Sequence, residues 1–222
     1  MALTFPLSLA DFFDQVRFTA LEFQLSDALE ISETGAGEIL TARNGQRLWG
    51  GTVSIVQNRY RDQEVIQSKL DVLRNSGASF LIGDRFAQYP KADPDGSILG
   101  ATAVTVHSIE ANNRELKLQG APDGYTVSAG DHISITYGSS PVKYAYFRVV
   151  TGSSFSDATS PTRTGLIEVQ PFISSSISAG ASVQLVKPCL KAVYVPGSIT
   201  GGSRSSLNIE GPIQFSWRQS LR

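Results

Sequence analysis

Apolar and polar residues alternate with a period of two along most of this chain, and that pattern predicts β-strands. A helical period occurs in one segment that runs from Asp62, a residue suited to cap a helix, to Gly77, a residue suited to end one. The apolar stripe of this segment consists of Val65, Ile66, Leu70 and Leu73. We therefore predict a mainly β protein with one amphipathic helix.

The chain before this helix contains several shorter patterns. Ser8 and Asp11 have the spacing of a capping box, which predicts a short helix over residues 9–14. Strands are predicted over residues 16–25, 35–42, 48–57 and, after the long helix, 78–84. Asn44-Gly45 lies between the second and third of these strands and predicts that they form a hairpin.

A segment rich in proline, glycine and charge, residues 89–100, marks a boundary, and no helical pattern appears between it and residue 188. Asn112-Asn113 tolerates left-handed turn conformations and predicts a hairpin within residues 101–120. Further strands are predicted near residues 131–137, 142–150, 165–172 and 181–187. Six short strands here favour a small closed barrel or a sandwich, because closure removes exposed edges.

The last segment decides the domain organisation. Ile213, Phe215 and Trp217 alternate with polar residues, and Leu221 continues the pattern, which predicts a half-buried strand. The N-terminal region has few strands to cover its helix, so we infer that this strand returns to it. The prediction is a discontinuous β-sandwich-like domain, residues 1–94 plus 189–222, with an inserted small β-barrel-like domain, residues 95–188.

Composition excludes several classes of protein. The 222 residues include 19 basic and 20 acidic side chains, and this balance argues against a surface built to bind nucleic acid or anionic lipid. Cys189 is the single cysteine, so no intrachain disulfide forms, and its apolar neighbours favour a buried structural thiol. The N-terminus lacks the pattern of a signal peptide, and no apolar run is long enough for a membrane helix.

No catalytic arrangement stands out. Asp131-His132 could open an active site, but the alternation of residues 131–137 places His132 on the polar face of a strand, with Asp131 accepting hydrogen bonds in a turn. His107 likewise shares the polar phase of its strand. Candidate carboxylates for a hydrolase are Asp93, Asp95, Glu110 and Glu168. We expect no enzyme, no cofactor and no metal site.

The order of elements resembles that of a known family. The phrases that carry the resemblance are "MALTFPLSLADFFD", "GAGEILTARNGQRLWGGTVSI", "GASFLIGD", "GYTVSAGDHISITYGSSPV", "GLIEVQPFI" and "AGASVQLVKP". Together they resemble the distal tail proteins of siphophages and prophages, in which a β-rich N-terminal domain with one helix is interrupted by a barrel-like domain. The resemblance implies a virion protein, assembled in the cytoplasm of the bacterial host, that forms a hexameric ring at the tail tip. Its implied partners are the tail tube protein, the baseplate hub protein and the tail fibres, with genomic DNA passing through the lumen without specific binding and no contact with membrane.

Such a ring needs surfaces that meet between copies, and edge strands of the first domain are the candidates. The candidate interface residues are Trp49, Val53, Ile55, Phe215, Trp217 and Leu221. For the two tryptophans the alternative is a place in the core. A second functional hypothesis is a carbohydrate- or receptor-binding module, for which Tyr144 and Tyr146 would contact the glycan. A third is a cell-wall hydrolase.

Overall fold

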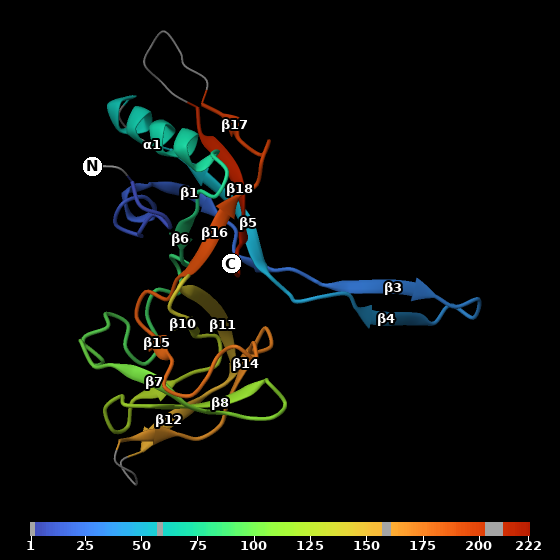
Figure 1. Ribbon diagram of the computed structural model, residues 1–222, viewed down its shortest axis with the longest axis vertical. Helices are drawn as coiled ribbons and strands as arrows, with labels where there is room; N and C mark the ends of the chain where they lie inside the picture. Colours follow the sequence, from blue (N-terminus) through green and yellow to red (C-terminus); the bar gives the residue numbers. More distant parts are fainter. Residues whose placement is uncertain (1–2, 57–59, 157–160, 203–210) are drawn as a thin grey trace.

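The computed structural model describes residues 3–56, 60–156, 161–202 and 211–222. It contains two main β-sheets, stacked along the long axis of the molecule, and a two-stranded arm that projects to one side (Figure 1). Among the described residues there is one α-helix, α1 (Tyr60–Leu73), and one 3-10 turn, η1 (Phe13–Gln15). The predicted fold class, mainly β with one helix and an inserted barrel, is confirmed.

The first sheet is built from both ends of the chain. Its main strands, in spatial order, are β1 (Phe18–Leu21), β5 (Trp49–Ile55), β18 (Ile213–Gln219), β16 (Leu190–Tyr194) and β6 (Phe80–Ile82). Two short strands extend it, β2 (Gln24–Leu25) beside β5 and β17 (Thr200–Gly201) beside β18. Strand β18 pairs antiparallel with β5 from Ile213↔Ile55 to Arg218↔Gly50. The predicted return of the C-terminal strand to the N-terminal sheet is therefore confirmed.

Helix α1 packs its apolar stripe into the core beneath this sheet. Ile66, Leu70 and Leu73 are buried with residues of β5, β6 and β18. Val65 was predicted to belong to the stripe, but it is 51% exposed, because adjacent residues point about 100° apart around a helix. Asp62 lies inside the first turn rather than at the cap, since the helix already begins at Tyr60.

The short N-terminal helix is shifted from its predicted place. The capping box is present, because the Ser8 hydroxyl donates to the Asp11 carboxylate at 2.6 Å and accepts from the Asp11 amide at 3.1 Å. The residues that follow form only the 3-10 turn η1. Phe12 and Phe13 are buried in the core of the first sheet.

The second sheet closes into a barrel of six strands. These strands, in order around the barrel, are β14 (Ile167–Gln170), β11 (Lys143–Thr151), β10 (His132–Tyr137), β15 (Ser182–Gln184), β7 (Val104–Ile109) and β8 (Glu115–Gln119). Pairing of β14 with β8 closes the ring, with Ile167 opposite Leu116. From β8 the sheet continues through β13 (Arg163–Thr164) and β12 (Ser153–Ser156) to β9 (Thr126–Val127). The hairpin predicted at Asn112-Asn113 joins β7 and β8, and Asn113 has a φ of +54°.

The predicted hairpin of residues 35–42 with 48–57 is wrong. Strand β4 (Ile39–Arg43) pairs instead with β3 (Leu29–Glu33), a strand that the sequence analysis missed. The turn between them is closed by Thr34, whose hydroxyl accepts the Glu38 amide hydrogen at 3.1 Å. Strand β5 has no room for β4, because β1 pairs with one of its edges and β18 with the other.

Candidate functional site

The candidate interface residues lie in the core of the first sheet. The exposed fraction is at most 2% for Trp49, Val53, Ile55, Phe215 and Trp217. Their strands, β5 and β18, are interior strands of the sheet and not edges. Their side chains therefore belong to the core, which is the alternative given above for the two tryptophans. Leu221 is half-buried and follows the end of β18.

Aromatic side chains from both sheets meet where the barrel joins the first sheet. The Phe23 ring lies between Trp217, 4.8 Å away, and Tyr146, 5.2 Å away, measured between ring centroids. The indole nitrogen of Trp49, on β5, donates a hydrogen bond of 2.9 Å to the backbone carbonyl of Tyr146, on the barrel strand β11. Contacts of this kind fix the orientation of the barrel relative to the first sheet, because the packed rings exclude water and the hydrogen bond is directional.

His132 lies in this junction, and its place differs from the prediction. It points away from the barrel interior, as the alternation requires, but the first sheet covers that face and leaves His132 only 5% exposed. Its Nε2 accepts a hydrogen bond of 2.9 Å from Nε of Arg148, so Nδ1 carries the proton and donates to the Tyr146 hydroxyl at 2.8 Å. Burial, followed by the positive charge of Arg148, lowers the pKa of His132 from 6.5 to about 4, while Asp84 opposes the shift.

The lowered pKa of His132 predicts acid sensitivity. Between about pH 6.5 and about pH 4 the unfolded chain binds a proton at His132 that the folded chain does not bind, so stability decreases as the pH falls through this range. We expect His132 to account for about 2–3 kcal/mol of this loss. The measurement is the free energy of unfolding in urea at pH 7, 5.5 and 4.5 for the wild type and His132→Gln. The dependence on pH should be weaker in His132→Gln than in the wild type, and an equal dependence in the two proteins would contradict the assignment.

Asp131 has the structural role that the turn pattern predicts. One carboxylate oxygen accepts the Ser128 amide hydrogen at 2.8 Å, and the other accepts that of Lys91 at 3.1 Å. The second bond ties the segment after β6 to the barrel. The hydroxyl of Ser134, on β10, accepts the amide hydrogen of Cys189 at 3.2 Å. Asp131-His132 thus opens a strand at the junction of the two sheets, where both side chains form hydrogen bonds with other groups of the chain.

The candidate glycan residues do not form an exposed aromatic pair. Tyr146 is 1% exposed and belongs to the core of the first sheet, so it cannot contact a sugar. Tyr144 is half-buried, and burial raises the pKa of its hydroxyl. Both side chains share one face of β11, as predicted, but that face is the one covered by the first sheet.

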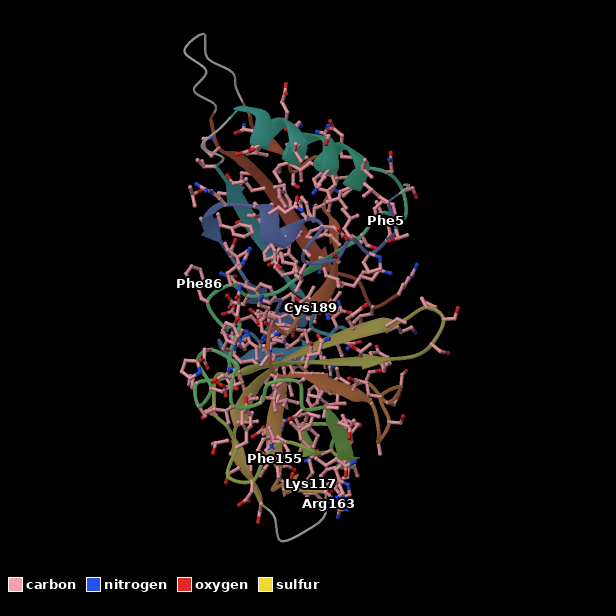
Figure 2. All side chains as sticks on the ribbon, turned by 90° about the vertical axis from the view of Figure 1, so that its left-hand side faces the viewer. Phe5, Phe86, Lys117, Phe155, Arg163 and Cys189 are labelled. Atoms are coloured by element: carbon pink, nitrogen blue, oxygen red, sulfur yellow. The ribbon has the colours of Figure 1, made fainter. Side chains whose placement is uncertain are left out.

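The other candidate reactive side chains are buried or hydrogen-bonded within the fold. Burial raises the pKa of the Cys189 thiol to about 11, and Figure 2 shows this residue at the level where the two parts of the molecule meet. The carboxylate of Asp93 is fully buried and accepts the amide hydrogens of Ile98 and Leu99 at 3.1 and 3.0 Å. Hydrogen bonds from Ser97 lower the pKa of Asp95.

The remaining candidate acids sit on barrel strands. Glu168 lies opposite Glu115 in the β14–β8 pair, and Glu110 follows the end of β7. In the described part of the chain, no three His, Cys, Asp or Glu side chains are grouped so that they could hold a metal ion. Within the same residues, no helix has the length and apolar character needed to cross a membrane.

Comparison of the chain with protein-family models and with curated proteins finds no match. The case for any function therefore rests on the residues themselves and on the geometry into which they fold.

The most exposed part of the fold is the arm, which we define as residues 29–43 (β3, β4 and their turn). Every residue of β3 and β4 is exposed, and Figure 1 shows the arm pointing away from both sheets. Sequence reasoning missed it, although Leu29 and Ile31 alternate with polar residues ahead of a turn that contains Gly35 and Gly37. Asn44-Gly45, the predicted hairpin turn, lies at the base of the arm, where the Asn44 amide donates to the Ala28 carbonyl at 2.8 Å.

Proposed function

We propose that this chain is a non-enzymatic structural protein of a phage virion, a ring at the tail tip that connects the tail tube to the hub and fibres. The observation that carries the proposal is the pairing of β18 with β5, which makes the barrel an insertion between two parts of one finished sheet. This is the order of elements that the resemblance to distal tail proteins implies. We divide the chain accordingly into a ring-forming domain, residues 1–94 plus 189–222, and an inserted barrel domain, residues 95–188.

Two further features support a role in assembly. The arm exposes aliphatic side chains to solvent, which is unfavourable for an isolated copy and is relieved by contact with another protein. The junction of the two sheets is closely packed and hydrogen-bonded, so the barrel has a fixed orientation relative to the first sheet. A fixed orientation suits a barrel that binds a neighbouring protein of the tail. In the proposed hexamer the ring-forming domains surround a lumen through which DNA passes without specific binding, and this requires a lining that is not strongly basic.

The test of this proposal is electron microscopy of the purified chain with the tail tube protein of the same virus. We expect closed rings of six copies that cap the tubes, and tubes prepared without this chain should have open ends. Antibody against the barrel domain should label the tail tip of intact virions. A chain that stays monomeric at high concentration, with and without tube protein, would contradict the proposal, as would labelling of virions at any other place.

A further inference from the structure

One face of the arm carries three exposed aliphatic side chains. Residues that lie directly opposite each other in a β-ladder have side chains on the same face. The register of β3 with β4 therefore places Leu29, Ile31 and Ile39 together, and these side chains are 51%, 67% and 63% exposed. The opposite face carries Glu30 and Ser32 with Leu40 and Ala42 across from them.

The base of the arm is held firmly, whereas its strands have no support. The guanidinium carbon of Arg43 lies 4.5 Å from the centre of the Phe172 ring, on the barrel side, where Arg114 also approaches that ring at 5.1 Å. Arg47 donates to the Ser26 carbonyl and forms an ion pair with Asp27. A two-stranded hairpin without further packing is only marginally stable in water. An arm fixed at its base and apolar along one face thus fits a role as a docking element.

We infer that the arm of one copy binds a second copy of this chain, in the groove between the end of α1 and strand β16. This groove has a volume of about 540 Å³. Val193, Tyr194 and Pro196 contribute apolar surface to it, while Arg74, Lys191 and Arg222 contribute basic groups.

Charge complementarity selects a second copy as the occupant. The arm carries three exposed glutamates against one arginine. Glu33 and Arg43 both lie on the face with the aliphatic side chains, and the Arg43 guanidinium is placed over the Phe172 ring at the base of the arm. The groove offers the reverse, apolar surface with basic groups around it. Arg74 is half-exposed and forms an ion pair with Asp71, and Lys191 is half-buried and donates to the Arg222 carbonyl. Each cation has further N–H donors, which a carboxylate can approach. Paired in this way, the aliphatic side chains leave water and the charges set the register of the contact.

The arm and the groove are different surfaces of the same chain, so each copy can bind one neighbour through its arm and another through its groove. Such a heterologous contact forms a ring when its rotation closes and a filament when it does not. The inference rests on the proposed function, since it names the surfaces by which the ring copies would meet.

Disulfide trapping between two separately purified variants tests the contact. Ile31→Cys places a thiol on the apolar face of the arm, and Pro196→Cys places one on an exposed position of the groove. Mixed under mild oxidation, they should form a covalent dimer of one copy of each. Val65→Cys, also at an exposed position but on α1, is the matched control. If Ile31→Cys couples to Pro196→Cys no faster than Val65→Cys does, the arm does not bind this groove.

Substitutions give an independent measurement by light scattering of full-length protein. Ile31→Asp should weaken self-association roughly tenfold or more, as expected for a central apolar contact, whereas Val65→Asp should not. Both variants should keep the wild-type melting temperature, because both side chains are exposed. Glu33→Arg should also weaken association, and adding Arg74→Glu in the same chain should restore part of it. Wild-type association in Ile31→Asp would overturn the inference.

Images of the same preparations separate this inference from the proposed function. Rings that form normally from Ile31→Asp, without trapping between arm and groove, contradict the arm contact and leave the ring intact. Trapped copies that assemble only into open chains contradict the ring and uphold the arm contact.

Discussion

Trp49→Ala is expected to lower the free energy of unfolding by about 3–5 kcal/mol, the usual cost of removing a large buried aromatic side chain. Trp49 is 1% exposed, and its ring lies 5.4 Å from that of Phe23 and 5.5 Å from that of Tyr146. The substitution therefore opens a cavity where the two sheets meet. Urea denaturation monitored by circular dichroism measures the change, and a loss below about 1 kcal/mol would show that the junction repacks.

A matched pair of substitutions isolates the hydrogen bond across the junction. Trp49→Phe removes the donor to the Tyr146 carbonyl, whereas the indole nitrogen of Trp217 is buried without a hydrogen-bond partner among the described residues. We expect Trp49→Phe to cost about 1–3 kcal/mol more than Trp217→Phe, because it leaves a buried carbonyl without this donor. Equal losses in the two variants would mean that the bond between the sheets contributes nothing to stability.

Gly51→Ala is expected to destabilise the chain by about 3 kcal/mol or more, the upper end of the range for an overpacked interior. A Cβ at residue 51 would lie 2.0 Å from the backbone carbonyl oxygen of Glu22, in the segment that joins β1 to β2. Backbone cannot rotate away as a flexible side chain can, so this segment must separate from β5. The same denaturation measurement applies.

Gly35→Ala is the control for this prediction. Gly35 lies in the turn of the arm, and a Cβ there would meet no atom within 4 Å. Its substitution should change the free energy of unfolding by less than about 0.5 kcal/mol. If Gly51→Ala were as mild as this control, the close approach of Glu22 to β5 would not be required for folding.

The barrel could be predicted well because its signals are local. Alternation over a few residues, together with turns such as Asn112-Asn113, predicted the strands, and their number predicted closure. The pairing of β4 could not be predicted in the same way. Asn44-Gly45 is a strong local hairpin signal, but the partner of β5 is β18, more than 150 residues further along the chain. A strand has two edges, and those of β5 pair with β1 and β18, so β4 has no edge of β5 to pair with.

The candidate site was harder to predict than the fold. Alternation correctly placed His132 outside the barrel, yet it could not indicate that another sheet covers that face. Tyr146 likewise points out of the barrel, on a face of β11 that the first sheet covers. The sequence pattern of β11 does not indicate this burial. Trp49 and Phe215 were candidate interface residues because their strands were expected at an edge, whereas further strands on both sides make β5 and β18 interior.

From the sequence alone follow the strand-rich composition, the amphipathic helix with most of its buried stripe, and the return of the C-terminal strand. All three depend on the periodic placement of apolar side chains along short stretches of chain. Tertiary structure alone decided which faces are covered, which strands are edges and that residues 29–43 stand free of both sheets. These properties depend on contacts between segments far apart in the chain, and solvent exposure is a property of the assembled surface rather than of any local pattern.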